Sequence, residues 1–188
     1  MIVMRNKWAV AIIVIAVVFI FVSNLYSREV ILKPKKISVI TSPEDSRDSR
    51  VIVYFDLPKE LSKSNVEIDY AILIFKAQVT DAVSGLIEVF PITKDWKTES
   101  AISWESPWDS LGGDYTKDYS GRSVSVKSES GMGKIKSNVT FIVKGWLDGI
   151  FVNNGLMIKP SKDDLENFPV KYSIYEDNIK LKISFCLD

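Results

Sequence analysis

The feature that most constrains this chain is an alternation of apolar and polar residues in short runs, which begins at Ile37 and continues through the rest of the sequence. In residues 179–187, every second residue from Ile179 onward is apolar. Alternation of this kind gives a strand one buried and one solvated face. Turn residues separate the runs at intervals typical of an all-β domain. The predicted strands are residues 37–41, 50–57, 68–79, 86–91, 101–105, 123–127, 155–160, 170–174 and 179–187.

One segment, residues 138–147, has the periodicity of a helix instead. Its apolar residues recur at the spacing of one helical face. They are Val139, Ile142, Val143 and Trp146. Asn138 or Ser137 is suited to cap the start of this helix, and Gly149 is suited to end it. We therefore expect one short helix in an otherwise β domain.

An uninterrupted apolar run of fifteen residues, 8–22, lies near the start of the sequence. A helix of that length rises about 22 Å, whereas the hydrocarbon core of a bilayer is about 30 Å thick. The run is long enough to insert and short enough to be the core of a signal peptide. Because the residues around Ser23 and Ser27 make a poor cleavage site, we expect an uncleaved anchor that contacts the lipid bilayer through residues 8–22.

After this anchor, the length of the chain suits a single globular domain. The predicted divisions are a membrane anchor or signal segment at residues 1–27, a basic linker at 28–36 and a β domain at 37–188. Pro34 prevents the linker from continuing the apolar helix. Basic residues flank the apolar run on both sides and are more numerous after it, so the positive-inside rule opposes an exported domain. Placing the β domain outside the cell therefore needs evidence other than the charge distribution.

Composition argues against several classes of protein. Twenty-four lysines and arginines balance twenty-four aspartates and glutamates, so no basic footprint for nucleic acid is present. The absence of histidine removes the commonest general base and transition-metal ligand. Cys186 has no partner for an intrachain disulfide and is expected to be a buried thiol. Glu99 and Glu105 could form a glycosidase pair, but nothing distinguishes them from the other carboxylates. We expect a protein that is not an enzyme.

Residues 95–108 contain three of the five tryptophans. Such a cluster is either the core of a β domain or an exposed platform on which sugar rings stack. Because indole rings dominate the packing of small β domains, Trp96, Trp104 and Trp146 are expected in the structural core.

Seven short segments follow one another in an order that has a parallel in a known family. They are residues 50–58, 71–75, 88–96, 101–107, 138–146, 153–159 and 173–185. Together they resemble DNRLRE-type domains, a family related to carbohydrate-binding modules and disaggregatase repeats. Its members are non-catalytic modules of polysaccharide-degrading and surface proteins. The resemblance covers nearly all of residues 37–185 and implies a jelly-roll β-sandwich, outside the cell, that binds polysaccharide.

The best candidates for carbohydrate contact lie in residues 107–120, a turn-rich stretch where loop geometry would expose aromatic rings. The predicted contacts are Trp108, Tyr115, Tyr119, Asp109 and Asp114. The alternative is a surface loop whose aromatics fold back onto the sandwich. Its carboxylates, with Asp118, are also oxygen ligands of the kind that calcium takes, although their spacing matches no EF-hand. The expectation is no metal and no cofactor, with calcium as the alternative.

These patterns together predict a membrane-anchored, extracellular, non-catalytic β-sandwich module that binds or organises surface polysaccharide. The expected location is the cell membrane, crossed once, with the C-terminal domain outside the cell. Cleavage of the N-terminal segment would instead give a secreted protein. The alternative function is a structural subunit of a cell-surface assembly, filament or membrane complex that contacts copies of itself. A hydrolase is a third hypothesis.

Overall fold

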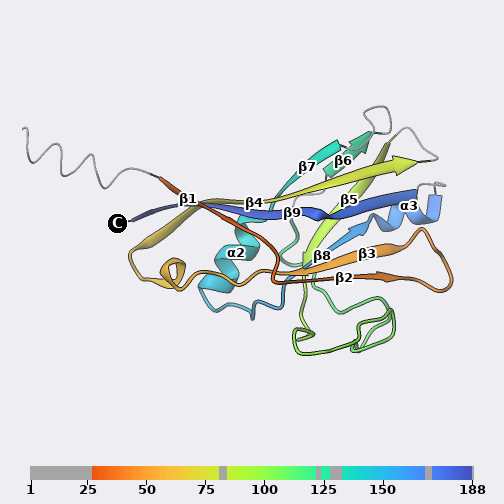
Figure 1. Ribbon diagram of the computed structural model, residues 1–188, viewed down its shortest axis with the longest axis horizontal. Helices are drawn as coiled ribbons and strands as arrows, with labels where there is room; N and C mark the ends of the chain where they lie inside the picture. Colours follow the sequence, from red (N-terminus) through yellow and green to blue (C-terminus); the bar gives the residue numbers. More distant parts are fainter. Residues whose placement is uncertain (1–26, 81–83, 122–123, 128–132, 168–170, 188) are drawn as a thin grey trace, which may run out of the picture.

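The computed structural model describes residues 27–80, 84–121, 124–127, 133–167 and 171–187. Within these ranges the chain is mostly β-strand and forms two antiparallel sheets (Figure 1). The four-stranded sheet has the order β1-β9-β4-β7, and the five-stranded sheet has the order β2-β3-β8-β5-β6. The strands are β1 (Arg28–Leu32), β2 (Lys36–Thr41), β3 (Ser49–Tyr54), β4 (Val66–Thr80), β5 (Ser84–Pro91), β6 (Val124–Lys127), β7 (Gly133–Asn138), β8 (Leu156–Pro160) and β9 (Lys171–Leu187).

One apolar core lies between the two sheets, an arrangement compatible with a β-sandwich. Strand β4 shows the pattern most clearly, because its alternate residues Ala71, Leu73 and Phe75 are fully buried while the residues between them are half-buried. Burying each large apolar side chain contributes about 1.5–3 kcal/mol. The five-stranded sheet and the helix after β7 complete the cluster with Val51, Val53, Val89, Leu156, Ile158, Ile142 and Val143.

The predicted helix is present as α2 (Thr140–Leu147), which starts two residues later than expected. The Asn138 side chain accepts a hydrogen bond from the backbone N–H of Thr140 at 3.0 Å, which satisfies one donor of the first turn. Gly149 follows the helix with φ of +69°, as expected for a helix-ending glycine. Two short elements were not predicted, a 3₁₀ turn, η1 (Lys59–Ser62), and a helix, α3 (Lys162–Asn167).

Most predicted strands are confirmed, with shifts at their ends. The predicted strand at residues 101–105 is wrong, because this segment is a loop in which the Ser103 hydroxyl accepts hydrogen bonds from the backbone N–H groups of Glu105 and Ser106. The two strands predicted at 170–174 and 179–187 belong to one long strand, β9, which pairs along β4 with two register shifts.

Two edge strands, β1 and β7, lie where no strand was predicted. Strand β7 has the sequence GKIKSN, in which Ile135 is the only large apolar residue. The sequence predicts a linker at residues 28–36, whereas the structure places Arg28–Leu32 in the four-stranded sheet beside β9. Val30 and Leu32 pack against the core, so this part of the segment belongs to the domain.

The predicted anchor at residues 8–22 lies outside the described residues. Among the residues that are described, no helix is long and apolar enough to cross a membrane. Cys186 is half-buried near the end of β9, rather than fully buried as expected.

Candidate functional site

A second apolar layer lies on the outer face of the five-stranded sheet. Residues 92–121, named here the covering loop, fold across that face and appear in green below β8, β3 and β2 in Figure 1. Ile52 of β3 and Met157 of β8 meet Trp96 of the loop, and all three are fully buried. The indole N–H of Trp96 donates a hydrogen bond to the Asn154 carbonyl at 2.7 Å. The loop is therefore packed against the sheet.

Trp108 does not provide the exposed ring that the sequence predicted. Its side chain is only 7 % exposed, and its indole N–H donates to the Ser103 carbonyl at 2.9 Å. Tyr115 stacks on Phe90 with ring centroids 4.8 Å apart. Tyr119 lies against Phe151 at the same centroid distance. The expectation that loop geometry exposes Trp108 is wrong, because the outer sheet face offers apolar surface on which Trp108 and Tyr115 pack.

The predicted contact carboxylates stabilise the loop itself. Asp114 accepts hydrogen bonds from the backbone N–H groups of Asp109 and Ser110 at 2.7 and 2.9 Å. The Asp109 carboxylate forms an ion pair with Lys94. Among the described residues, no group of three or more acidic, histidine or cysteine side chains is placed to hold a metal ion.

The three tryptophans predicted for the core have different environments. Trp96 is fully buried, as predicted. Trp146 is also buried, at 7 % exposed, and its indole N–H has no hydrogen-bond acceptor among the described residues. Trp104 is only half-buried, at the margin of the second apolar layer. It is therefore the tryptophan of the covering loop that retains accessible surface.

Arg50 of β3 holds Trp104 in place. The guanidinium carbon lies 4.3 Å from the centroid of the Trp104 ring, so a cation covers one face of the indole. The same guanidinium makes two hydrogen bonds to the Asp48 carboxylate, at 2.6 and 2.8 Å, and one to the Gly112 carbonyl at 2.7 Å. Gly112 has φ of +79°, and a Cβ there would lie 2.6 Å from Arg50 Nη1. The close approach of this backbone therefore requires glycine.

Cations also contact other aromatic rings where the covering loop meets the five-stranded sheet. The Lys36 amine lies 4.9 Å from the Trp96 ring centroid and donates to three loop carbonyls. Lys159 of β8 lies 5.9 Å from the ring centroids of both Phe90 and Tyr115. It is only 4 % exposed, and its amine donates to the Pro160 carbonyl at 2.8 Å and contacts Glu88 at 3.4 Å. Burial lowers the pKa of Lys159 despite the opposing charge of Glu88.

Replacing Lys159 by methionine is expected to raise the free energy of unfolding by about 1 kcal/mol at pH 7, because it removes a buried charge while keeping the apolar stem. The Lys159 amine binds its proton more tightly in the unfolded chain than in the folded chain. The wild-type protein therefore gains stability as the pH rises from the lowered pKa of the folded state toward the ordinary value of 10.5. The advantage of Lys159→Met should therefore shrink at alkaline pH. Denaturant titrations of both proteins across pH 7–10 measure the difference. A variant clearly less stable at pH 7 would show that the Glu88 contact outweighs the cost of burial.

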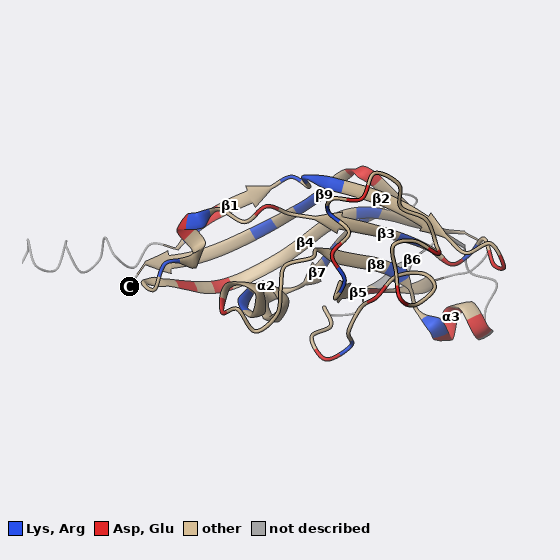
Figure 2. Cartoon of the chain, turned by 90° about the horizontal axis from the view of Figure 1, so that it is seen from below, with Lys and Arg blue, Asp and Glu red and all other residues tan. Residues whose placement is uncertain are grey.

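An open groove of about 410 Å³ runs beside Trp104, between the covering loop, the β2–β3 turn and α3. We call it the Trp104 groove. Its apolar surface comes from Trp104, Leu111 and Leu165, and Leu111 is 69 % exposed. Its carboxylates are Glu44, Asp45, Asp48 and Glu105. Figure 2 shows acidic segments in the loops and in α3.

A smaller recess of about 370 Å³ adjoins this groove and shares Leu111 with it. Tyr115 and Asp114 line this recess together with Arg50. Two of the predicted contact residues are therefore brought near the Trp104 groove, whereas Trp108 and Tyr119 line neither cavity. Sequence reasoning missed Trp104 as a surface residue because its motif position suggested the core.

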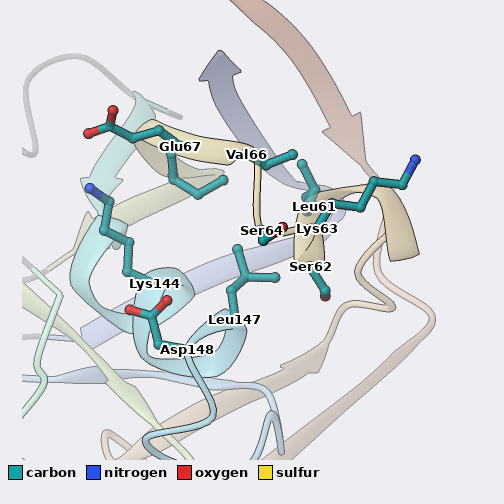
Figure 3. A pocket seen from close by; sticks show the side chains of 10 residues that line it. Leu61, Ser62, Lys63, Ser64, Val66, Glu67, Lys144, Leu147 and Asp148 are labelled. Carbon is teal, nitrogen blue, oxygen red and sulfur yellow. The ribbon is translucent and has the colours of Figure 1, made fainter. Parts of the chain in front are cut away.

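A separate recess of about 480 Å³ lies between η1, the start of β4 and the C-terminal part of α2 (Figure 3). Its charged side chains are Lys63, Glu67, Lys144 and Asp148, and its apolar ones include Leu61 and Leu147. None of its lining residues is aromatic. It therefore offers no flat ring on which a sugar could stack, unlike the Trp104 groove.

Comparison with known proteins adds no family to this description. The sequence matches no protein-family model, and no curated protein is significantly similar to it. The resemblance to DNRLRE-type domains therefore stays a prediction.

Proposed function

We propose that this protein is a non-catalytic module that binds surface polysaccharide, with the Trp104 groove as the contact site. The observation that carries the proposal is a half-buried tryptophan held by a buried arginine at the side of a groove that contains four carboxylates. An aromatic face stacks on the apolar face of a sugar, and carboxylates accept hydrogen bonds from its hydroxyl groups. The groove volume falls within the range of about 300–1,000 Å³ typical of small-ligand sites.

The proposed fold is a jelly roll, as the DNRLRE resemblance implies. The strand order supports it when β2 is set aside as an added edge strand. The remaining eight strands form two four-stranded sheets, β1-β9-β4-β7 and β3-β8-β5-β6, and the chain repeatedly passes from one sheet to the other. The first and last strands are neighbours, as in a jelly roll.

The proposed location is the cell surface, with residues 8–22 as a single-pass anchor and the β domain outside. The length and apolar character of that run support the anchor. The orientation follows from the proposed glycan ligand and from the DNRLRE resemblance.

Calorimetric titration of the full chain in detergent, with neutral and acidic polysaccharides, tests the glycan proposal. At least one glycan should give saturable heat, and Trp104→Ala should weaken its binding about tenfold, which corresponds to about 1.4 kcal/mol of stacking energy. Phe141→Ala is the matched control, because Phe141 is 78 % exposed on α2 and lines no part of the groove. No heat across a broad panel, or equal losses in both variants, would contradict the assignment.

A second candidate function is a subunit of a cell-surface assembly. It is favoured by three large apolar side chains that stay exposed on and just after α2, namely Phe141, Ile150 and Val152. Exposed apolar surface of this kind marks contact sites when it is contiguous. Size-exclusion chromatography with light scattering distinguishes the two functions, since an assembly subunit should form oligomers that a Phe141→Ser, Ile150→Ser double variant weakens.

A further inference from the structure

The outward face of the four-stranded sheet places isoleucines between lysines. Strand register sets Lys182 beside Ile72, and it sets both Lys136 and Lys180 beside Ile74. A groove of about 530 Å³ lies on this face, and its lining residues are Ile31, Tyr70, Ile72, Ile74, Lys134, Lys136 and Lys182. Ile31 is 56 % exposed. We call this surface the basic face. Its members are Ile31, Tyr70, Ile72, Ile74, Lys76, Lys134, Lys136, Lys180 and Lys182.

Most lysines of the basic face lie outside ion pairs among the described residues. Lys182 is paired with Glu29 at 2.5 Å. The other four lysines form no ion pair within the part of the chain that the structure describes. Lys76 lies directly opposite Lys134 on the neighbouring strand, where like charges destabilise a sheet. In a chain of zero net charge, this concentration of lysines fits a negatively charged partner.

We propose that the basic face docks on a membrane surface that contains anionic lipids. Lysines attract anionic headgroups, and exposed aliphatic side chains between them gain by entering the interfacial region. A polysaccharide would instead be expected to use aromatic rings, whereas the apolar members here are three isoleucines and one tyrosine.

The position of β1 supports the same partner. Strand β1 is an edge strand of this sheet and begins at Arg28, six residues after the apolar run ends at Val22. Six extended residues span at most about 20 Å. If the run is an anchor, the sheet is therefore held close to the bilayer. The membrane tether of the proposed function supports this docking, which does not depend on glycan binding.

Docking in this way would orient the Trp104 groove. The basic face and the covering loop lie on the outward faces of opposite sheets, with the main core between them. A domain lying with its basic face on lipid would therefore present the covering loop and the Trp104 groove away from the membrane. The groove would then be open to a glycan outside the bilayer.

Lysine footprinting of the full chain in lipid nanodiscs tests the proposal. The protein is placed in phosphatidylcholine discs or in discs that also contain phosphatidylglycerol, and is treated briefly with a membrane-impermeant acylating reagent. Peptide mass spectrometry then gives the labelling rate of each lysine. In anionic discs, labelling of Lys76, Lys134, Lys136 and Lys180 should fall about fivefold and should recover at high salt. Exposed Lys59 and Lys117 are internal controls and should not change.

A paired set of variants separates docking from general attraction. The double variant Lys134→Gln, Lys136→Gln should abolish most of the protection of Lys76 and Lys180 from acylation in anionic discs. The control double variant Lys59→Gln, Lys63→Gln should leave that protection intact. These positions are all exposed, so both variants should fold.

Each outcome decides the matter. Equal labelling of the basic face in neutral and anionic discs would overturn docking, as would protection by an added acidic polysaccharide in neutral discs without protection by anionic lipid. A chain that stays out of neutral discs but binds anionic ones, with the four lysines protected, would refute the anchor and keep the docking surface. Loss of glycan binding alone would leave this result unchanged.

Discussion

Arg50→Ala is expected to lower the free energy of unfolding by about 3 kcal/mol or more. The Arg50 side chain is 10 % exposed, and its removal leaves the Asp48 side chain, only 13 % exposed, without its ion pair. The Gly112 carbonyl also loses its donor, and the Trp104 ring loses the cation that covers one face. Leaving buried polar groups unpaired is what makes such truncations costly. Guanidinium denaturation followed by near-ultraviolet circular dichroism measures the change.

The chain offers a matched control in Arg47. Arg47 pairs with Asp45 two residues earlier, as Arg50 pairs with Asp48, but both partners are about one-third exposed. Arg47→Ala should therefore have a much smaller effect than Arg50→Ala, because solvent screens an exposed pair. If the two variants lost similar amounts of unfolding free energy, the buried contacts of Arg50 with Asp48, Gly112 and Trp104 would not be what stabilises the covering loop.

Trp96→Ala is expected to lower the free energy of unfolding by about 3–5 kcal/mol. Trp96 is fully buried between the covering loop and the five-stranded sheet, so its removal leaves a large cavity. It also removes the hydrogen bond to Asn154 and the ring beneath the Lys36 amine. These contacts join the loop to the sheet. In the variant, backbone amides of residues 92–121 should therefore exchange with solvent faster than in wild type, and this increase should be larger than at the amides of β4 and β9.

Phe141→Ala provides the comparison for Trp96→Ala, since it also removes an aromatic ring but from an exposed position. It should change the free energy of unfolding by less than about 0.5 kcal/mol. A Trp96 variant with unchanged exchange in the covering loop would contradict the packing of the loop on the sheet.

The elements with strong periodicity could be predicted from sequence. Strands β4 and β9 and helix α2 each bury a regular set of side chains, so apolar spacing reveals them. The edge strands β1 and β7 escaped prediction. An edge strand pairs on one side only and can be largely polar, and β7 has a single large apolar residue, Ile135.

The candidate site was less accessible to sequence reasoning. The turn-rich composition of residues 107–120 correctly indicates a loop, but it does not show that the loop lies against the outer sheet face. One signal was present in β8, where the sequence LMIKP is buried at every position. A strand that is apolar on both faces indicates a second layer above the sheet. That layer buries Trp108 and leaves Trp104 at its margin. The difference between the two tryptophans depends on packing between β3 and the loop, which are far apart in the sequence.

The central claim is that glycan binds beside Trp104 and not at Trp108. Nuclear magnetic resonance tests it most directly, because each of the five tryptophans gives one indole N–H signal that single Trp→Phe variants can assign. Titrating the full chain in detergent with a binding glycan should shift the Trp104 signal and leave those of the buried Trp96 and Trp146 in place. A titration in which the Trp108 signal moves while Trp104 stays fixed, or in which no indole signal responds to any glycan, would contradict the assignment.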